Sequence, residues 1–271
     1  MPADPAAAVC DVSGVQPEAR EVIRAAAQVY ARHSAPWLVG LLVHGSAYKG
    51  DFIPGCSDID LKLYLRDEVF AGAERQLPFA LAAAIQRDLA RIDPAPFQYI
   101  QCYAEGSSPR AGQLGPVPGA YHLLLGRLPV AEATAEQLEV AAHAALARLN
   151  PHPAYITTTL LQHGGGKLER AVRLACTDVW PALYQALSVQ RADPLRVWTL
   201  PKQRAIALLL SDSPMRRAIE RFYASIIAYY DDEPSVERGI DALRDAMTFL
   251  AAARAWWDEV GAPDGATPER L

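Results

Sequence analysis

The first half of the chain switches between helical and strand patterns of apolar residues. Between positions 17 and 32 apolar residues recur every three or four positions, which predicts an amphipathic helix. Residues 37–44 form a short continuous apolar run, typical of a strand buried on both faces. Residues 58–65 alternate polar and apolar side chains and predict a second strand. A loop rich in glycine, proline and serine joins the two strands.

Weaker patterns continue this alternation toward the middle of the chain. They predict helices over 77–91 and 133–149, and strands over 97–104 and 121–130. Clusters of proline and glycine then break the pattern, and strand signals nearly vanish after them. We therefore expect a first domain of residues 1–150 and a helical domain of residues 151–271.

The second domain is predicted to consist of helices only. Proline at helix starts and helical apolar spacing place them at 167–190, 201–210, 214–230 and 234–260. The predicted fold class is α+β. A small mixed sheet with flanking helices forms the N-terminal domain, and an all-helical bundle forms the C-terminal domain.

Composition and charge narrow the choice of partner. Hydrophobic residues make up 51% of the chain, which is enough for a substantial core. The formal net charge of −5 disfavours a nucleic acid partner, because no overall positive field would attract its backbone. No segment has the length and apolarity of a membrane span, and the N-terminal residues lack a basic, apolar leader. With no paired cysteine motif either, we expect a cytoplasmic protein that does not bind membranes.

The candidate chemistry lies between the first two predicted strands. Asp58 and Asp60 are two positions apart on a strand, so both carboxylates point to the same face, where oxygen ligands can hold Mg²⁺. Two carboxylates on one face repel each other without a cation, which argues against a purely structural role. At the end of the preceding strand, Gly45 allows the backbone to approach phosphate oxygens, and Ser46 can donate its hydroxyl and amide to them.

This stretch is a Gly-Ser pair, eleven further residues and then Asp-x-Asp, and it resembles the signature of the DNA polymerase beta type nucleotidyltransferases. The whole chain is similar to the streptomycin and spectinomycin type of aminoglycoside adenylyltransferases. The resemblance implies that Gly45 and Ser46 hold the triphosphate of ATP, that Asp58 and Asp60 hold Mg²⁺, and that Ser57 contacts the nucleotide. It implies transfer of AMP from Mg-ATP to a hydroxyl of a small acceptor, such as an aminoglycoside-like antibiotic.

A second resemblance concerns the helical half. Pro201-Lys202 is similar to the proline-lysine helix of those adenylyltransferases, which implies that Lys202 reaches the ATP phosphates. Asp178 and Trp180 lie where that family has residues facing the acceptor. Alternatives remain for two of these residues, because Lys202 also fits an exposed helix lysine and Trp180 also fits ordinary core packing.

The sequence departs from the family at the third carboxylate. Related enzymes place an acid on the next strand as metal ligand or general base, and Gln98 stands there in this chain. An amide cannot take a proton near neutral pH, so Glu105 at the end of that strand is an alternative base. The competing prediction is a non-catalytic nucleotide-binding regulator, or a nucleotidyltransferase-type antitoxin, with an incomplete carboxylate set. Acceptor, nucleotide base and oligomeric state stay open.

Overall fold

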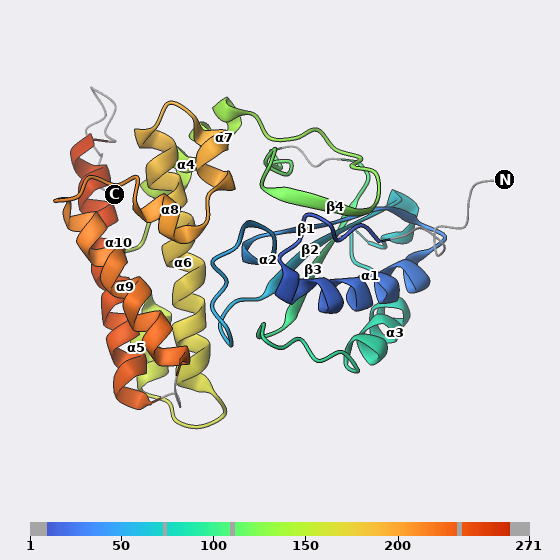
Figure 1. Cartoon of the computed structure of the whole chain (residues 1–271), viewed down its shortest axis with the longest axis horizontal. Coiled ribbons are helices and arrows are strands. Elements are labelled where there is room, and N and C mark those ends of the chain that lie inside the picture. Colours follow the sequence, from blue (N-terminus) through green and yellow to red (C-terminus); the bar gives the residue numbers. More distant parts are fainter. Residues whose placement is uncertain (1–9, 73–74, 109–111, 232–234, 261–271) are drawn as a thin grey trace. The chain divides into compact units, whose positions relative to one another are not determined.

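The computed structural model describes residues 10–72, 75–108, 112–231 and 235–260 (Figure 1). It is a mixed α and β structure that divides into two compact units, Met1–Ala133 and Thr134–Leu271. The sequence prediction put the boundary later, after residue 150. The segment in between holds a helix that packs within the second unit, as described below.

The first unit is built around a four-stranded mixed sheet. Its strands lie in the order β3-β2-β1-β4, with β1 antiparallel to β2 and β4, and β2 parallel to β3. The strand bounds are β1 (Leu38–His44), β2 (Ile59–Leu65), β3 (Ile100–Gly106) and β4 (Tyr121–Gly126). The helices are η2 (Pro17–Ala19), α1 (Arg20–Ser34), α2 (Ser46–Lys49), η3 (Asp67–Val69) and α3 (Phe79–Leu89).

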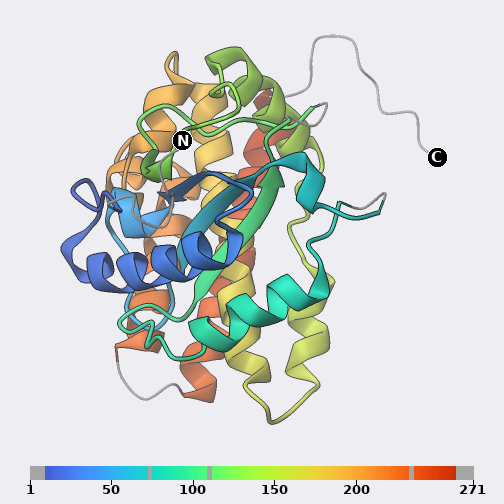
Figure 2. The same ribbon diagram turned by 90° about the vertical axis from the view of Figure 1, so that its right-hand side faces the viewer.

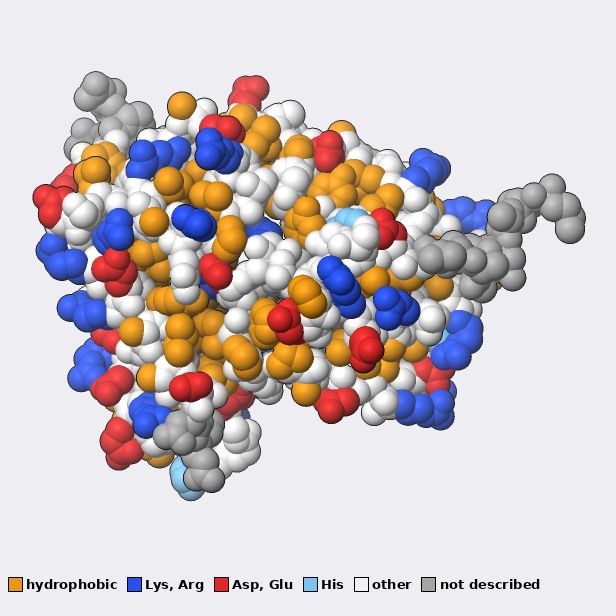
Figure 3. Space-filling model, in the orientation of Figure 1, with side chains coloured by type: hydrophobic (Ala, Val, Ile, Leu, Met, Phe, Trp, Pro, Cys, Tyr) orange, Lys and Arg blue, Asp and Glu red, His pale blue; other side chains and the backbone are white. Residues whose placement is uncertain are grey.

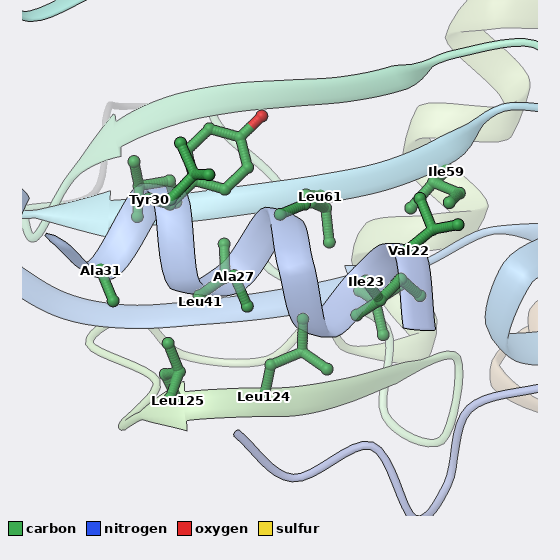
Figure 4. Packing of buried hydrophobic residues seen from close by; sticks show 14 of the residues in the cluster. Val22, Ile23, Ala27, Tyr30, Ala31, Leu41, Ile59, Leu61, Leu124 and Leu125 are labelled. Atoms are coloured by element: carbon green, nitrogen blue, oxygen red, sulfur yellow. The ribbon is translucent and has the colours of Figure 1, made fainter. Parts of the chain in front are cut away.

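One face of this sheet carries the hydrophobic core. Side chains of α1, including Ile23 and Ala27, point onto β1, β2 and β4, where Leu41 and Leu61 are fully buried (Figure 4). Helix α3 lies beside α1, and its Ile85 joins the same core (Figure 2). Each buried aliphatic side chain of this size stabilises the fold by about 1.5–3 kcal/mol. The opposite face carries polar side chains such as Asp60 and Lys62 beside the fully buried Leu42 and Tyr64.

The predicted elements of this unit are confirmed, with differences in detail, among them the short helix η3, which was not predicted. The loop after β1 contains a helical turn, α2, which was not predicted because the segment is rich in glycine and serine. Strand β3 begins at Ile100 and not at position 97. Strand β4 ends at Gly126, whose φ is +69° and where a Cβ would lie 2.2 Å from the Val39 carbonyl oxygen. The backbone must therefore leave the sheet at a glycine.

The second unit contains only helices among its described residues. They are α4 (Ala135–Ala147), α5 (Ala154–Leu160), α6 (Lys167–Gln190), α7 (Pro194–Thr199), α8 (Lys202–Ile206), α9 (Pro214–Tyr230) and α10 (Val236–Val260). Helix α4 starts with a capping box between Thr134 and Gln137 and packs on α6. In the described part of the chain, no helix combines the length and apolarity needed to cross a membrane.

Two helices of this unit were not predicted. Helix α5 follows Pro153, and α7 begins at Pro194 with the Asp193 side chain accepting a hydrogen bond from the Arg196 amide at 3.0 Å. Both are shorter than the window over which helical periodicity becomes visible. The prediction of four helices after residue 150 was therefore wrong in number.

Acidic and basic side chains are interspersed on the protein surface shown in Figure 3. On that face, the described residues form no continuous basic stripe of the kind that follows a nucleic acid backbone.

Candidate functional site

The register of β1 against β2 joins the two halves of the Gly-Ser and Asp-x-Asp motif. His44, the last residue of β1, is the Cα partner of Asp60 on β2. Gly45 and Ser46 follow β1 directly, and Asp58 comes directly before β2. Because the strands are antiparallel, the end of one lies beside the start of the other. The Gly-Ser turn and the two aspartates therefore meet at one edge of the sheet.

Gly45 packs against the carboxylate of Asp60. Its φ of +69° and ψ of −156° lie in a region that only glycine adopts readily. A Cβ at this position would lie 2.2 Å from Oδ2 of Asp60. The missing side chain thus leaves the space that the Asp60 carboxylate occupies, and Ser46 then begins the short helix α2.

The loop before Asp58 is held by Ser57. The Ile53 amide donates a hydrogen bond to Oγ of Ser57 at 2.8 Å, and the Ser57 amide donates to the Ile53 carbonyl at 2.9 Å. The Ser57 carbonyl accepts the Gln98 amide at 2.8 Å. These hydrogen bonds of Ser57 hold the loop that leads to Asp58. The Ser57 hydroxyl acts as an acceptor there, so its O–H can still donate a hydrogen bond to a ligand. The predicted contact of Ser57 with the nucleotide stays a prediction.

Two residues of the third strand segment stand opposite Asp58. The Gln98 amide donates to Ser57, while the Ile59 amide donates to the Tyr99 carbonyl at 3.0 Å, so Gln98 and Tyr99 share one position, as in a β-bulge. Because side chains do not alternate strictly between the two faces of a sheet at a bulge, the face on which the exposed Gln98 side chain lies does not follow from its position in the sequence.

Sequence reasoning missed Gln101, which is the Cα partner of Asp60 in the parallel pair of β2 and β3. Its Oε1 accepts a hydrogen bond from the Tyr99 hydroxyl at 2.8 Å. Residues that are paired across a sheet share a face, so an amide lies directly beside the Asp60 carboxylate. Gln101 could have been identified only from the register of β3, and the sequence prediction began that strand three residues too early.

Glu105 lies farther along the same face and is held by two partners. Its Oε1 is 3.4 Å from Nζ of Lys62, and its Oε2 accepts a hydrogen bond from Nε2 of Gln113 at 2.7 Å. Lys62 shares the face of Asp60, since it is two residues further along β2. The side chains of Lys62 and Glu105 are each 22% exposed.

Two buried polar atoms on this face lack a hydrogen-bond partner within the described residues, namely Nε2 of His44 and the hydroxyl of Tyr64. Burial, reinforced by the charges of Lys62 and Lys49, lowers the pKa of His44 to about 4, so its imidazole is neutral at pH 7. A buried polar atom without a partner costs about 1–3 kcal/mol, which a bound ligand or water would offset. The only sequence signal for His44 was its place directly before Gly45.

These residues form a suitable donor set for Mg²⁺ together with a triphosphate. Protein sites usually supply Mg²⁺ with one or two carboxylates, and phosphate oxygens and water complete the octahedron. Asp58 and Asp60 give two carboxylates, and the Gly45 turn brings the backbone against one of them. Within the described ranges no group of three or more His, Cys, Asp and Glu side chains could hold a metal alone.

In the second unit, Lys202 and Trp180 lie close together. Nζ of Lys202 is 5.5 Å from the centre of the Trp180 ring, a cation–π distance. The same ring packs against Phe222 and Tyr223, with centroid distances of 5.4 Å and 5.7 Å. Trp180 therefore has a packing role, and it also places the ammonium of Lys202 near the start of α8.

Asp178 lines a cavity of about 490 Å³ in the same unit. Its Oδ2 accepts a hydrogen bond from the Tyr155 hydroxyl at 2.9 Å. Burial raises the pKa of the Asp178 carboxyl, and the hydrogen bond from Tyr155 opposes that shift. Several polar side chains complete the lining: Arg148, Asn150, Thr177 and Gln185. The cavity thus offers a carboxylate, a guanidinium, amides and a hydroxyl to a polar ligand.

We expect Asp178→Asn to raise the melting temperature of the protein at pH 7. The folded carboxyl has a raised pKa, so wild-type stability falls as pH rises from the unfolded value of about 3.9 through the folded value. Asparagine does not ionise and still accepts the Tyr155 hydrogen bond. Thermal unfolding at pH 4 and pH 7 should show the gain at pH 7 and a smaller one at pH 4.

Asp212→Asn, an exposed change of the same charge, is the control and should leave the melting temperature near the wild-type value. A lower melting temperature for Asp178→Asn than for Asp212→Asn at pH 7 would contradict this account of the Asp178 carboxyl.

No model of a known protein family matches the chain, and no curated protein sequence matches it.

Proposed function

We propose that the protein is a nucleotidyltransferase that moves AMP from Mg-ATP to a hydroxyl of a small acceptor, such as an aminoglycoside-like antibiotic. The observation that carries the proposal is the contact between the Gly45 turn and the Asp60 carboxylate. Two segments that the sequence singled out for phosphate and metal binding lie together at one edge of the sheet. Under this proposal the first unit is the nucleotidyltransferase domain and the second is its helical bundle.

Each residue of the proposed site has a role in binding the metal ion or the triphosphate. When bound, Mg²⁺ supplies positive charge to the triphosphate and orients it. Asp58 and Asp60 would hold that ion, and the backbone amide of Ser46 would donate to the phosphate oxygens. The reaction itself needs the acceptor hydroxyl to be aligned with the α-phosphorus, which positioning alone can accelerate strongly.

Acceptor binding is proposed for the cavity around Asp178. Its carboxylate suits an ammonium group, and the surrounding amides and hydroxyl suit sugar hydroxyls. A polycationic, hydroxylated acceptor combines both kinds of group. Trp180 contributes through its position next to Lys202.

Pyrophosphate release tests the proposal directly. Purified protein, Mg²⁺ and ATP labelled in the γ-phosphate are incubated with a panel of aminoglycosides and with simple polyols. We expect labelled pyrophosphate and an AMP-modified product with at least one acceptor. ATP binding without pyrophosphate from any acceptor would favour the second candidate, a non-catalytic nucleotide-binding regulator or antitoxin. This second candidate is supported by the neutral side chain of Gln101, which is the partner of Asp60 on β3 where a further acid could stand.

Lys202→Ala is expected to weaken ATP binding, since a charge-assisted contact with phosphate contributes roughly 1.5–3 kcal/mol. Calorimetric titration of ATP in the presence of Mg²⁺ measures the change. Lys167→Ala, at the exposed first residue of α6, is the matched control and should leave the ATP dissociation constant unchanged. Equal constants for both variants would leave Lys202 with its packing role against Trp180 only.

A further inference from the structure

We infer that the proposed site holds a single divalent cation, and that Glu105 is not a ligand of it. This inference rests on the proposed function and specifies the metal content of the same site. It concerns the third strand, where a second metal would need a further acid next to Asp58 and Asp60.

The strand register separates Glu105 from the aspartates. Gln101 is the Cα partner of Asp60, and Glu105 is the partner of Tyr64, four residues further along each strand. At about 3.3 Å per residue this is about 13 Å along the sheet. Oxygen ligands of Mg²⁺ lie about 2.1 Å from the ion, so a shared ion would require Asp60 and Glu105 to stretch toward each other almost fully.

The contacts of Glu105 hold it away from such a position. Both of its carboxylate oxygens are engaged, one by Lys62 at 3.4 Å and the other by Gln113 at 2.7 Å. Lys62 stands between Asp60 and Tyr64 on β2, and its ammonium is on the face that a second ion would use. A partly buried ammonium next to that position repels a further cation.

The residue nearest to Asp60 on the third strand is neutral. The amide of Gln101 adds no charge to the site, and the Tyr99 hydroxyl already bonds its oxygen. Gln98 and Tyr99, opposite Asp58, add none either. Two carboxylates compensate the charge of one divalent ion, and a second ion would have no carboxylate of the chain left to bind it. The acceptor hydroxyl must then be activated without a metal of its own.

Counting bound Mn²⁺ by electron paramagnetic resonance tests the inference. Mn²⁺ is titrated into the full chain with an equimolar amount of α,β-methylene-ATP, which cannot transfer AMP, and the signal of free aqueous Mn²⁺ is measured. We expect one tightly bound Mn²⁺ per chain. Two would overturn the single-cation inference and leave the proposed function intact. Mn²⁺ binding that is no tighter than to the analogue without protein would contradict both.

Two matched variants, Glu105→Gln and Asp60→Asn, test which of the two carboxylates binds the metal ion. Glu105→Gln removes the charge of Glu105 at constant size, and we expect its Mn²⁺ dissociation constant to stay within about threefold of the wild-type value, as for a partly exposed charge at a distance. Asp60→Asn makes the same kind of change at a proposed ligand and should weaken Mn²⁺ binding by more than about tenfold. A loss in Glu105→Gln as large as that in Asp60→Asn would overturn the assignment of Glu105, and circular dichroism checks that both variants fold.

Discussion

Asp58→Asn and Asp60→Asn should each abolish nucleotidyl transfer while the protein stays folded. Each change removes one negative charge from the proposed metal site and keeps the size of the side chain. Both residues are only partly buried, so neither substitution disturbs the core. The loss of a metal-ligating charge should cost several kcal/mol of transition-state stabilisation. Pyrophosphate release under saturating ATP measures the effect, and circular dichroism confirms the fold.

The residual rate of pyrophosphate release in the two variants decides whether the aspartates bind the metal. Activity above about a tenth of the wild-type value in both variants corresponds to a loss below about 1.4 kcal/mol, too little for a metal ligand. Such a result would remove the proposed role of the two aspartates.

Gly45→Ala should destabilise the protein and also impair metal and nucleotide binding. Its backbone conformation costs a residue with a side chain about 1–3 kcal/mol. In addition, the new methyl group would collide with Oδ2 of Asp60, 2.2 Å away, and displace that carboxylate. Thermal unfolding measures the first effect. The Mn²⁺ dissociation constant measures the second.

Gly50→Ala is a close control for the second effect. Gly50 has a similar conformation, with φ of +92° and ψ of −173°, but a Cβ there would meet only the Gln16 side chain at 3.6 Å. We expect both alanine variants to lose stability and only Gly45→Ala to lose Mn²⁺ affinity. Equal Mn²⁺ affinity in the two variants would show that the contact between Gly45 and Asp60 does not shape the site.

The sequence predicted the sheet and the motif for a physical reason. The middle of β1 is buried on both faces and β2 is buried on its core face, so their apolar patterns are strong, and Gly45 and Asp60 stand at their ends. The pairing of β2 with β3 was hidden, because it depends on backbone hydrogen bonds that leave no periodic trace in sequence. Gln101 was missed for that reason. The partners of Glu105 were missed as well, since Lys62 and Gln113 come from separate segments.

The helical unit shows a different limit. Long helices such as α6 and α10 repeat their apolar positions often enough to be identified, whereas α5 and α7 are about two turns or fewer. Helix α4 was predicted as a helix, but which unit it packs in depends on its contact with α6 and not on its own pattern.

The close approach of Gly45 to the Asp60 carboxylate has an evolutionary consequence. A carboxylate at position 60 and a side chain at position 45 compete for the same few cubic ångströms, so the two positions cannot drift independently. In homologous chains, loss of the glycine should be accompanied by a residue at position 60 that no longer presses against the turn. In an alignment of homologues, positions 45 and 60 should therefore covary, and a paired change at both positions should mark chains that no longer bind the metal.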